Sequence, residues 1–314
     1  MSARSDQYCD SSQAGKFLPG EMVEVLSESE ILATLDEKGT LENQPFMPEM
    51  LKFCGRTFQV SRQAFKTCVD DQDMRQLNTT VFLEEVRCDG SSHGGCGRAC
   101  LIFWKEAWLK PAGSASAENG FHAAQVSPAD LISLAHRDGQ FFCQSTEILN
   151  ASSPLLWWEV KQYLWDLKYN RVPLLDWFQG LFIAAYNKVA HICKFKSWRF
   201  VTGPAADFQA QALNLKPREL VRVKSLAQIR NTLDPAGKHQ NLLFAPTMMG
   251  FCGQVLRVQD RVENIILEAT PRQRKIKDTV LLEGATCDGI CHRLCPRQSF
   301  LFWRECWLER VSIP

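Results

Sequence analysis

The stretch FLPGEMVEV at residues 17–25 recurs as LKPRELVRV at residues 215–223, an offset of 198 residues. The same offset relates FCG at 53–55 to FCG at 251–253. After one residue is inserted in the second copy, CDG at 88–90 matches CDG at 287–289, and FWKEAWL at 103–109 matches FWRECWL at 302–308. A match of this length within one chain is not chance, so the sequence contains one module twice.

Both copies contain short alternating segments separated by turn residues, a pattern typical of β-strands. The expected strands are 22–25, 57–60 and 80–83 in the first copy, and 220–223, 255–258 and 279–282 in the second. Several short strands of this kind predict a small β-barrel. The opening Pro-Gly-Glu-x-Val-x-Val resembles SH3-like barrels, which implies that fold for both modules. The phrases around FCG and FWKEAWL also resemble uncharacterised bacterial proteins, and that resemblance implies no function.

The segment between the modules has no counterpart in either copy. Ser127 is a suitable N-cap for a helix that runs to about residue 135. Residues 154–168 and 174–193 predict two further helices, and a broad apolar face on the second one is expected to pack on the barrels. The predicted class is therefore α+β, with two homologous SH3-like barrel modules joined by a mainly helical segment. The predicted divisions are a disordered tail at 1–16, the first module at 17–111, a linker and helical segment at 112–214, and the second module at 215–314.

The composition narrows the range of functions. The net charge of +1 gives no overall basic field, so nucleic acid is not favoured as a partner. The N-terminus lacks the features of a secretory signal, and no run of about 18 apolar residues predicts a transmembrane helix. The expected location is therefore the cytoplasm, where cysteines stay reduced. The 13 cysteines then favour metal binding or catalysis over disulfides.

Comparison of the two copies selects among these cysteines. Three thiolates and one imidazole make a complete tetrahedral set for Zn²⁺, and soft sulfur ligands argue against Mg²⁺ or Ca²⁺. We therefore predict a Cys3His zinc site in each module. Cys68 lies opposite Ile266 or a neighbour and is not matched. The positions occupied by the same ligand type in both copies are Cys54 and Cys252, Cys88 and Cys287, His93 and His292, and Cys96 and Cys295.

Two further thiols lie close to the matched ones. Cys100 falls opposite Ser299, and Cys291 falls opposite Ser92, so Cys100 and Cys291 are alternative ligands for a four-cysteine site. The sequence CDGSSH at 88–93 resembles the CDGSH iron–sulfur motif, in which three cysteines and one histidine bind a [2Fe–2S] cluster. The histidine lies one residue farther along here, and the family's upstream Cys-x-Cys pair is missing. The resemblance implies iron or [2Fe–2S] as the alternative to zinc.

Two constellations have residue types that could be catalytic. Glu106 and Glu305 lie between tryptophans in the repeated FWxExWL phrase, where each could be a general base or a structural acceptor of N–H groups, and the structural role is favoured. His136 and Cys143 could form a thiol nucleophile pair, although a buried neutral cysteine is the more common case. Because no Walker loop, His-Glu-x-x-His or Gly-x-Ser-x-Gly motif is present, the sequence leaves open whether the protein is an enzyme.

The leading hypothesis is a zinc-binding tandem-barrel protein that acts as an interaction or accessory protein, with a protein partner that the sequence does not identify. The first alternative is a metalloenzyme or electron-transfer protein with an iron or iron–sulfur site. The second is a nucleic-acid-binding module, because aromatic and basic residues alternate at 195–200. The sequence specifies neither a substrate nor an oligomeric state.

Overall fold

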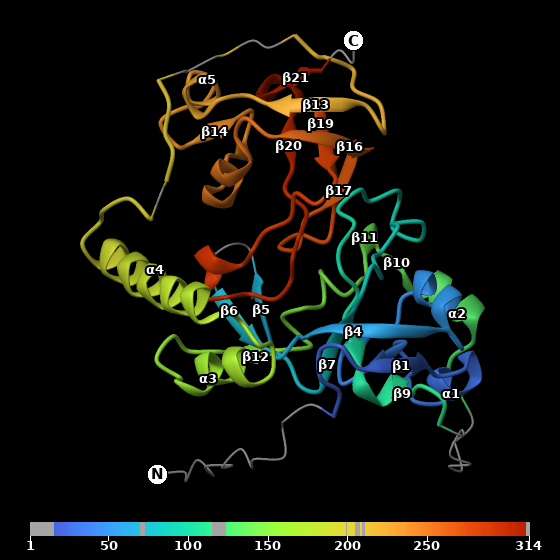
Figure 1. Cartoon of the computed structure of the whole chain (residues 1–314). Coiled ribbons are helices and arrows are strands. Elements are labelled where there is room, and N and C mark those ends of the chain that lie inside the picture. The colour runs from blue at the N-terminus through green and yellow to red at the C-terminus, as the bar shows by residue number, and fades with distance from the viewer. Residues whose placement is uncertain are drawn as a thin grey trace, which may run out of the picture.

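The computed structural model describes residues 16–69, 73–114, 124–198, 200–204, 208 and 211–311. It contains both helices and many small antiparallel sheets, which confirms the predicted mixed α+β class. The two largest sheets lie at opposite ends of the molecule (Figure 1). To one side, α4 (Leu174–Ile192) lies between them, and α3 (Lys161–Lys168) lies at the level of the first sheet. Except for Lys16, the tail predicted at 1–16 lies outside the described residues.

The two five-stranded sheets have the same strand order. The first has the order β8 (Trp104–Lys105), β7 (Thr80–Leu83), β4 (Thr57–Gln63), β1 (Met22–Val25) and β9 (Leu109–Pro111). The second has the order β20 (Trp303–Arg304), β19 (Thr279–Leu282), β16 (Val255–Arg261), β13 (Leu220–Val223) and β21 (Leu308–Arg310). All six strands predicted from the sequence are present. Among the described residues, no ladder joins the two end strands of either sheet.

The register of the two sheets also agrees. In β1, Val23 and Val25 are fully buried while Glu24 between them faces outward, as the alternating pattern predicts. The long strand β4 shifts register between Val60 and Arg62, and β16 shifts at the matching pair, Val258 and Asp260. Such bulges bend a strand and increase its twist. Each long strand can therefore curve over its own core.

Each core is built around two fully buried tryptophans. The ring of Phe46 meets the Trp108 ring edge-on, with centroids 5.3 Å apart, and Phe244 meets Trp307 at the same 5.3 Å. The indole N–H of Trp108 donates to the hydroxyl of Thr34 at 3.1 Å. The repeated aromatic phrase therefore supplies the largest side chains of each core. These side chains stabilise the core because each one buries a large apolar area.

Short helices connect the strands. Ser27 caps α1 (Glu28–Leu32) with a reciprocal bond to Glu30, and Ser225 caps α5 (Leu226–Arg230) in the same way. The remaining elements of the two modules are β2 (Thr40–Leu41), β3 (Gln44–Pro45), η2 (Pro48–Phe53), η3 (Glu106–Trp108), β14 (Lys238–His239), β15 (Leu242–Leu243), η4 (Pro246–Phe251), η5 (Ile290–His292) and η6 (Glu305–Trp307).

Each module also extends a hairpin away from its sheet. In the first module it consists of β5 (Lys66–Val69) and β6 (Asp73–Gln76), to which β12 (Ser153–Pro154) of the middle segment adds a third strand. In the second module it consists of β17 (Asn264–Ile266) and β18 (Gln273–Lys275). These hairpins lie between the two large sheets (Figure 1), and they form much of the junction between the modules.

The middle segment contains three helices near the places expected from the sequence, together with a small hairpin, although the second helix begins at Lys161 and not at residue 154. They are α2 (Pro128–Leu134), α3, α4, β10 (His136–Arg137) and β11 (Gln140–Phe141). Ser127 caps α2, as predicted. None of the described helices has both the length and the apolar character that crossing a membrane requires.

The prediction that the apolar face of α4 packs on the barrels is wrong. On this face Leu174 is 63% exposed, Phe178 61% and Ile192 68%, and Ile183 is buried. The helix instead buries its narrow side, where Gly180 lets the backbone approach Leu294 of the second module. A Cβ at position 180 would lie 2.7 Å from the Leu294 side chain, so the small residue sets this contact.

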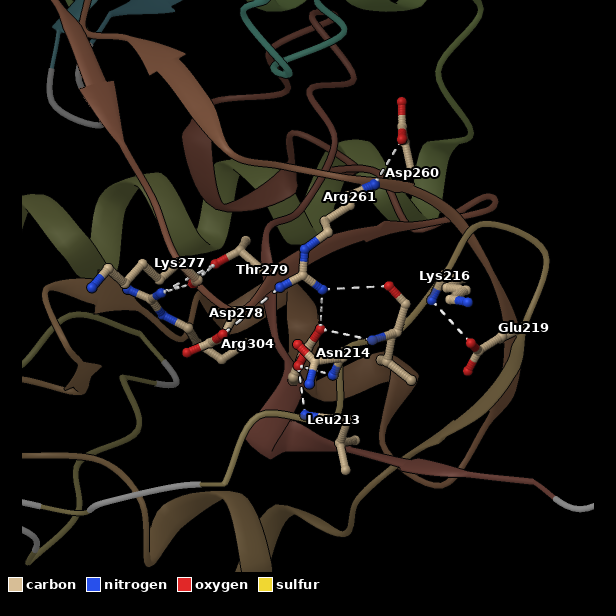
Figure 2. Close-up of polar contacts among 12 residues, drawn as sticks. Leu213, Asn214, Lys216, Glu219, Asp260, Arg261, Lys277, Asp278, Thr279 and Arg304 are labelled. Atoms are coloured by element: carbon tan, nitrogen blue, oxygen red, sulfur yellow. Dashed lines mark hydrogen bonds and ion pairs between the residues drawn. The ribbon is translucent and has the colours of Figure 1, made fainter.

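Glu106 and Glu305 each fasten the first residues of a module. The Glu305 carboxylate is fully buried and accepts the N–H groups of Leu213, Asn214 and Leu215 at 2.6, 2.8 and 3.0 Å. Figure 2 shows the first two of these groups and the Arg261 guanidinium around one carboxylate, which Arg261 meets at 2.6 Å. Glu106 accepts the N–H groups of residues 16 and 17 at 2.7 and 3.3 Å. Both contacts support the structural role over the catalytic one.

We expect Glu305→Gln to reduce the free energy of unfolding by about 3 kcal/mol, because it removes the close ion-pair partner of Arg261 and leaves only the longer contact to Asp278 at 3.8 Å. Glu106→Gln should cost only about 1 kcal/mol, because Gln63 replaces the arginine in the first module and no charge is left unpaired. Denaturant unfolding of the two variants measures the difference. Equal losses would contradict the assignment of the larger effect to the ion pair.

Candidate metal centre

The loop that follows β7 folds tightly around its own backbone. The N–H groups of His93 and Gly95 both donate to the carbonyl of Gly90, at 2.9 and 3.1 Å, and Cys96 N–H donates to the carbonyl of His93 at 3.2 Å. Gly90 has a φ of +70°, and a Cβ there would lie 2.3 Å from the Cys96 carbonyl oxygen. Only glycine fits this position. The turn draws the candidate ligands of the loop into a small volume.

Backbone N–H groups point at the loop sulfurs in both modules. Gly90 N–H donates to Cys88 Sγ at 3.4 Å, and Gly289 N–H donates to Cys287 Sγ at the same distance. Cys96 and Cys295 each accept a bond from the backbone two residues farther on. Hydrogen bonds to sulfur favour the thiolate over the thiol, and the thiolate is the form that binds metals.

A carboxylate that the sequence did not single out completes the first cluster. Glu49 Oε1, on η2, lies 2.6 Å from His93 Nδ1, 3.1 Å from the N–H of Ser92 and 3.9 Å from Cys88 Sγ. The ligand atoms of Glu49, Cys88 and His93 all lie within 4.8 Å of one another. Glu49 Oε2 is buried and has no hydrogen-bond partner among the described residues. Carboxylate, thiol and imidazole groups are ligand types that bind divalent metal ions.

The charges in this cluster depend on one another. Burial acts to raise the pKa of Glu49, but the hydrogen bond and charge of His93 outweigh it, so this pKa is lowered. Burial and the nearby carboxylate raise the pKa of Cys88 well above its usual range. A bound cation would reverse this preference, because metal ligation deprotonates the thiol.

More thiols line the pocket beside this cluster. Cys88, Cys96, Cys100 and Cys143 line one pocket with His93, and apolar side chains such as Leu101, Phe103 and Ile266 form part of its wall. Burial raises the pKa of Cys143 to about 11. Cys100 Sγ lies 3.7 Å from the hydroxyl of Ser145. The structure thus brings the predicted ligands Cys88 and Cys96 together with Cys100, the alternative ligand, and Cys143, the candidate nucleophile.

Other predicted residues lie elsewhere. Cys54 caps the end of η2 and does not line the pocket, and burial together with Glu28 raises its pKa to about 11. His136 is exposed on β10, where its ring packs on Phe141 with centroids 4.6 Å apart. The structure gives no contact between His136 and Cys143. The histidine that faces the segment around Cys143 is His93, whose Nε2 lies 3.4 Å from the carbonyl of Phe142.

The second module arranges its loop similarly but has different neighbours. Thr247 replaces Glu49 and bonds to Cys287, whose pKa burial raises to about 12. Cys252 caps the end of η4, as Cys54 caps η2. His292 ends the short helix η5, and Cys291 lies in the same turn. Cys295 is fully buried beside Cys68 of the first module.

Glu49 and Cys68 are the two residues that sequence comparison missed. The comparison retained only ligand types present in both copies, and these positions are Thr247 and Ile266 in the second copy. The only indication available in the sequence was that the copies differ there by a possible metal ligand. Scans against family models, curated proteins and solved structures found no match to this chain.

We expect Gly90→Ala to open the first loop, because its methyl group would collide with the backbone of Cys96. Gly95 is the matched control, since it has the same φ of +70° but a Cβ there would meet nothing within 4 Å. Gly95→Ala should cost about 1 kcal/mol, the cost of the left-handed backbone alone. Thermal unfolding should show a much larger loss for Gly90→Ala, and similar losses would argue against the close approach.

Proposed function

We propose that the first module binds one Zn²⁺ ion in the thiol-lined pocket, through Cys88, His93, Cys96 and Cys100. The observation that supports this most directly is the cluster of Glu49, Cys88 and His93 within 4.8 Å. Imidazole and thiolate together are the ligand set that Zn²⁺ prefers. Relative to the ligand set expected from the sequence, Cys100 replaces Cys54, because Cys54 does not line the pocket.

Glu49 orients the histidine in this proposal and is not itself a ligand. A histidine that binds metal through one ring nitrogen usually donates its other N–H to a carboxylate, which fixes the ring and makes it a stronger ligand. The 2.6 Å contact from Glu49 Oε1 to His93 Nδ1 is of this kind, and Nε2, which has only a long contact of 3.4 Å to the Phe142 carbonyl, would bind the metal. The ligands alone account for the binding, and Glu49 tunes it.

The ion would act structurally, in an accessory or interaction protein made of two SH3-like modules. Its loop lies against the other module, since Gly97 N–H donates to the Asn264 carbonyl at 2.8 Å and Arg98 donates to the Ile266 carbonyl at 3.1 Å. A metal that fixes this loop therefore also fixes the junction between the modules. We propose that the protein works in the cytoplasm, where free thiols persist.

An iron site is the second candidate, and one observation favours it. Four cysteines line the same pocket, which is enough thiolate to bind a [2Fe–2S] cluster. An electron-transfer role would follow from such a cluster. A visible absorption spectrum of freshly purified protein separates the two candidates, because Zn²⁺ is colourless.

We expect purified protein to contain zinc, and we expect Cys88→Ser and Cys96→Ser each to remove one equivalent. Cys193→Ser is the matched control, because Cys193 is exposed at the end of α4. Elemental analysis measures the ratio of metal to protein. Unchanged zinc in both loop variants, with native circular dichroism, would refute the proposed site.

Glu49→Gln should weaken zinc binding by about 10- to 100-fold without abolishing it, because it removes a partner of a ligand and not a ligand. Competition with a chelator of known affinity measures the change. If Glu49→Gln instead removes the zinc as completely as Cys88→Ser does, Glu49 is itself a ligand.

A further inference from the structure

The two modules exchange their hairpins. Cys68, on β5 of the first module, donates its N–H to Cys295 Sγ of the second module at 3.2 Å. In the opposite direction, Ile266 on β17 donates its N–H to Cys96 Sγ at 3.4 Å. Cys68 and Ile266 are matching positions, and so are Cys295 and Cys96. Each cysteine loop is therefore covered by the hairpin of the other module.

Two matching arginines fix this exchange. Arg297 donates to the carbonyl of Cys68 at 3.2 Å, and Arg98 donates to the carbonyl of Ile266 at 3.1 Å. The two crossings thus share these backbone contacts, and at the matching position one has Cys68 and the other Ile266. Only the second module's loop therefore receives a thiol, that of Cys68, from the hairpin of the other module.

That thiol lies in a cluster of sulfurs. Cys68 Sγ is 3.3 Å from Cys295 Sγ, although the two residues are 227 positions apart. The hydrogen bond between the sulfurs raises the pKa of Cys68 and lowers that of Cys295, and a charge on Cys287 would raise the pKa of Cys68 further. Cys287 lies on the same tight loop as Cys295, whose N–H donates to the carbonyl of Gly289 at 3.3 Å and whose carbonyl would lie 2.1 Å from a Cβ at position 289. Sulfur groups gathered in this way are the soft ligands that a thiophilic divalent cation prefers.

We propose that Cys68, Cys287 and Cys295 form a second metal site, which binds a thiophilic divalent cation such as Zn²⁺ between the two modules. As each metal–sulfur bond forms, a thiol releases its proton to solvent, so binding is stronger at higher pH until the thiols are ionised. This set replaces Cys252, which caps η4, with Cys68.

The backbone around the site already favours thiolates. Gly289 N–H donates to Cys287 Sγ, Cys68 N–H donates to Cys295 Sγ, and the Arg297 guanidinium adds a positive charge near both Cys68 and Cys295. Hydrogen bonds and a cation lower the cost of burying charged sulfur. The site shares no residue with the first pocket, so it can be tested independently of the proposed function.

The test compares bound zinc in the full-length protein and its variants after incubation with Zn²⁺ alone. Cys68→Ser should lose one equivalent and keep the zinc of the first pocket, whereas Cys193→Ser should lose none. If the first pocket binds no metal, Cys68→Ser still lowers the zinc content and Cys88→Ser does not. Undiminished zinc in a natively folded Cys68→Ser variant would overturn the inference.

A second measurement needs no substitution and is unaffected by misfolding. Cys68 and Cys295 in wild-type protein should resist alkylation together and become reactive together when a chelator is added, as peptide mass spectrometry would show. Two outcomes contradict the proposal. One is alkylation before the chelator is added, and the other is release only by a reductant, which would indicate a disulfide.

Discussion

The arrangement of the three parts of the chain depends on one buried guanidinium, that of Arg297. It donates to the carbonyl of Cys68 in the first module and to the Ser145 hydroxyl of the middle segment at 2.7 Å, and it pairs with Glu268 of the second. Burial disfavours its charge, but the Glu268 carboxylate outweighs burial, and the pKa of Arg297 is raised. A buried charge is tolerated only where its partners surround it. The hairpin, the cysteine loop and the middle segment must therefore meet at one place.

A second buried pair strengthens the same junction. Lys66, two residues before Cys68, meets Asp166 of α3 at 2.6 Å and donates to the carbonyl of Arg293 at 2.6 Å, and both charged side chains are fully buried. Burial lowers the pKa of Lys66 and raises that of Asp166 to about 6. Burial therefore disfavours both charges, and only their close contact offsets this cost. Such pairs add little net stability but disfavour any other arrangement of the parts. They position the hairpin that carries Cys68.

The strands and the positions of the cysteine loops could be predicted from local patterns and from the repeat, but the neighbours of these loops could not. Strands such as 22–25 were predictable because apolar and polar residues alternate along them, as buried and outward-facing positions alternate in a strand. The partners of Cys96 and Cys295 lie on hairpins of the opposite module, and no local pattern specifies that crossing. The α4 prediction failed for a related reason. An apolar stripe indicates which face avoids water, but the small residue Gly180 determined which side packs.

The differences between the copies are informative because the backbone between them is so alike. Gln63 donates to the carbonyl of Phe17 where Arg261 meets a carboxylate, Glu49 contacts a histidine where the second copy has Thr247, and Cys68 lies where the second copy has Ile266. Each exchange alters a charge or a ligand and leaves the surrounding strand order unchanged. Two identical sites would require identical neighbours. The chain instead surrounds one loop with a carboxylate and extra thiols, and the other with a thiol from its partner module, so the two loops are suited to different ligand sets.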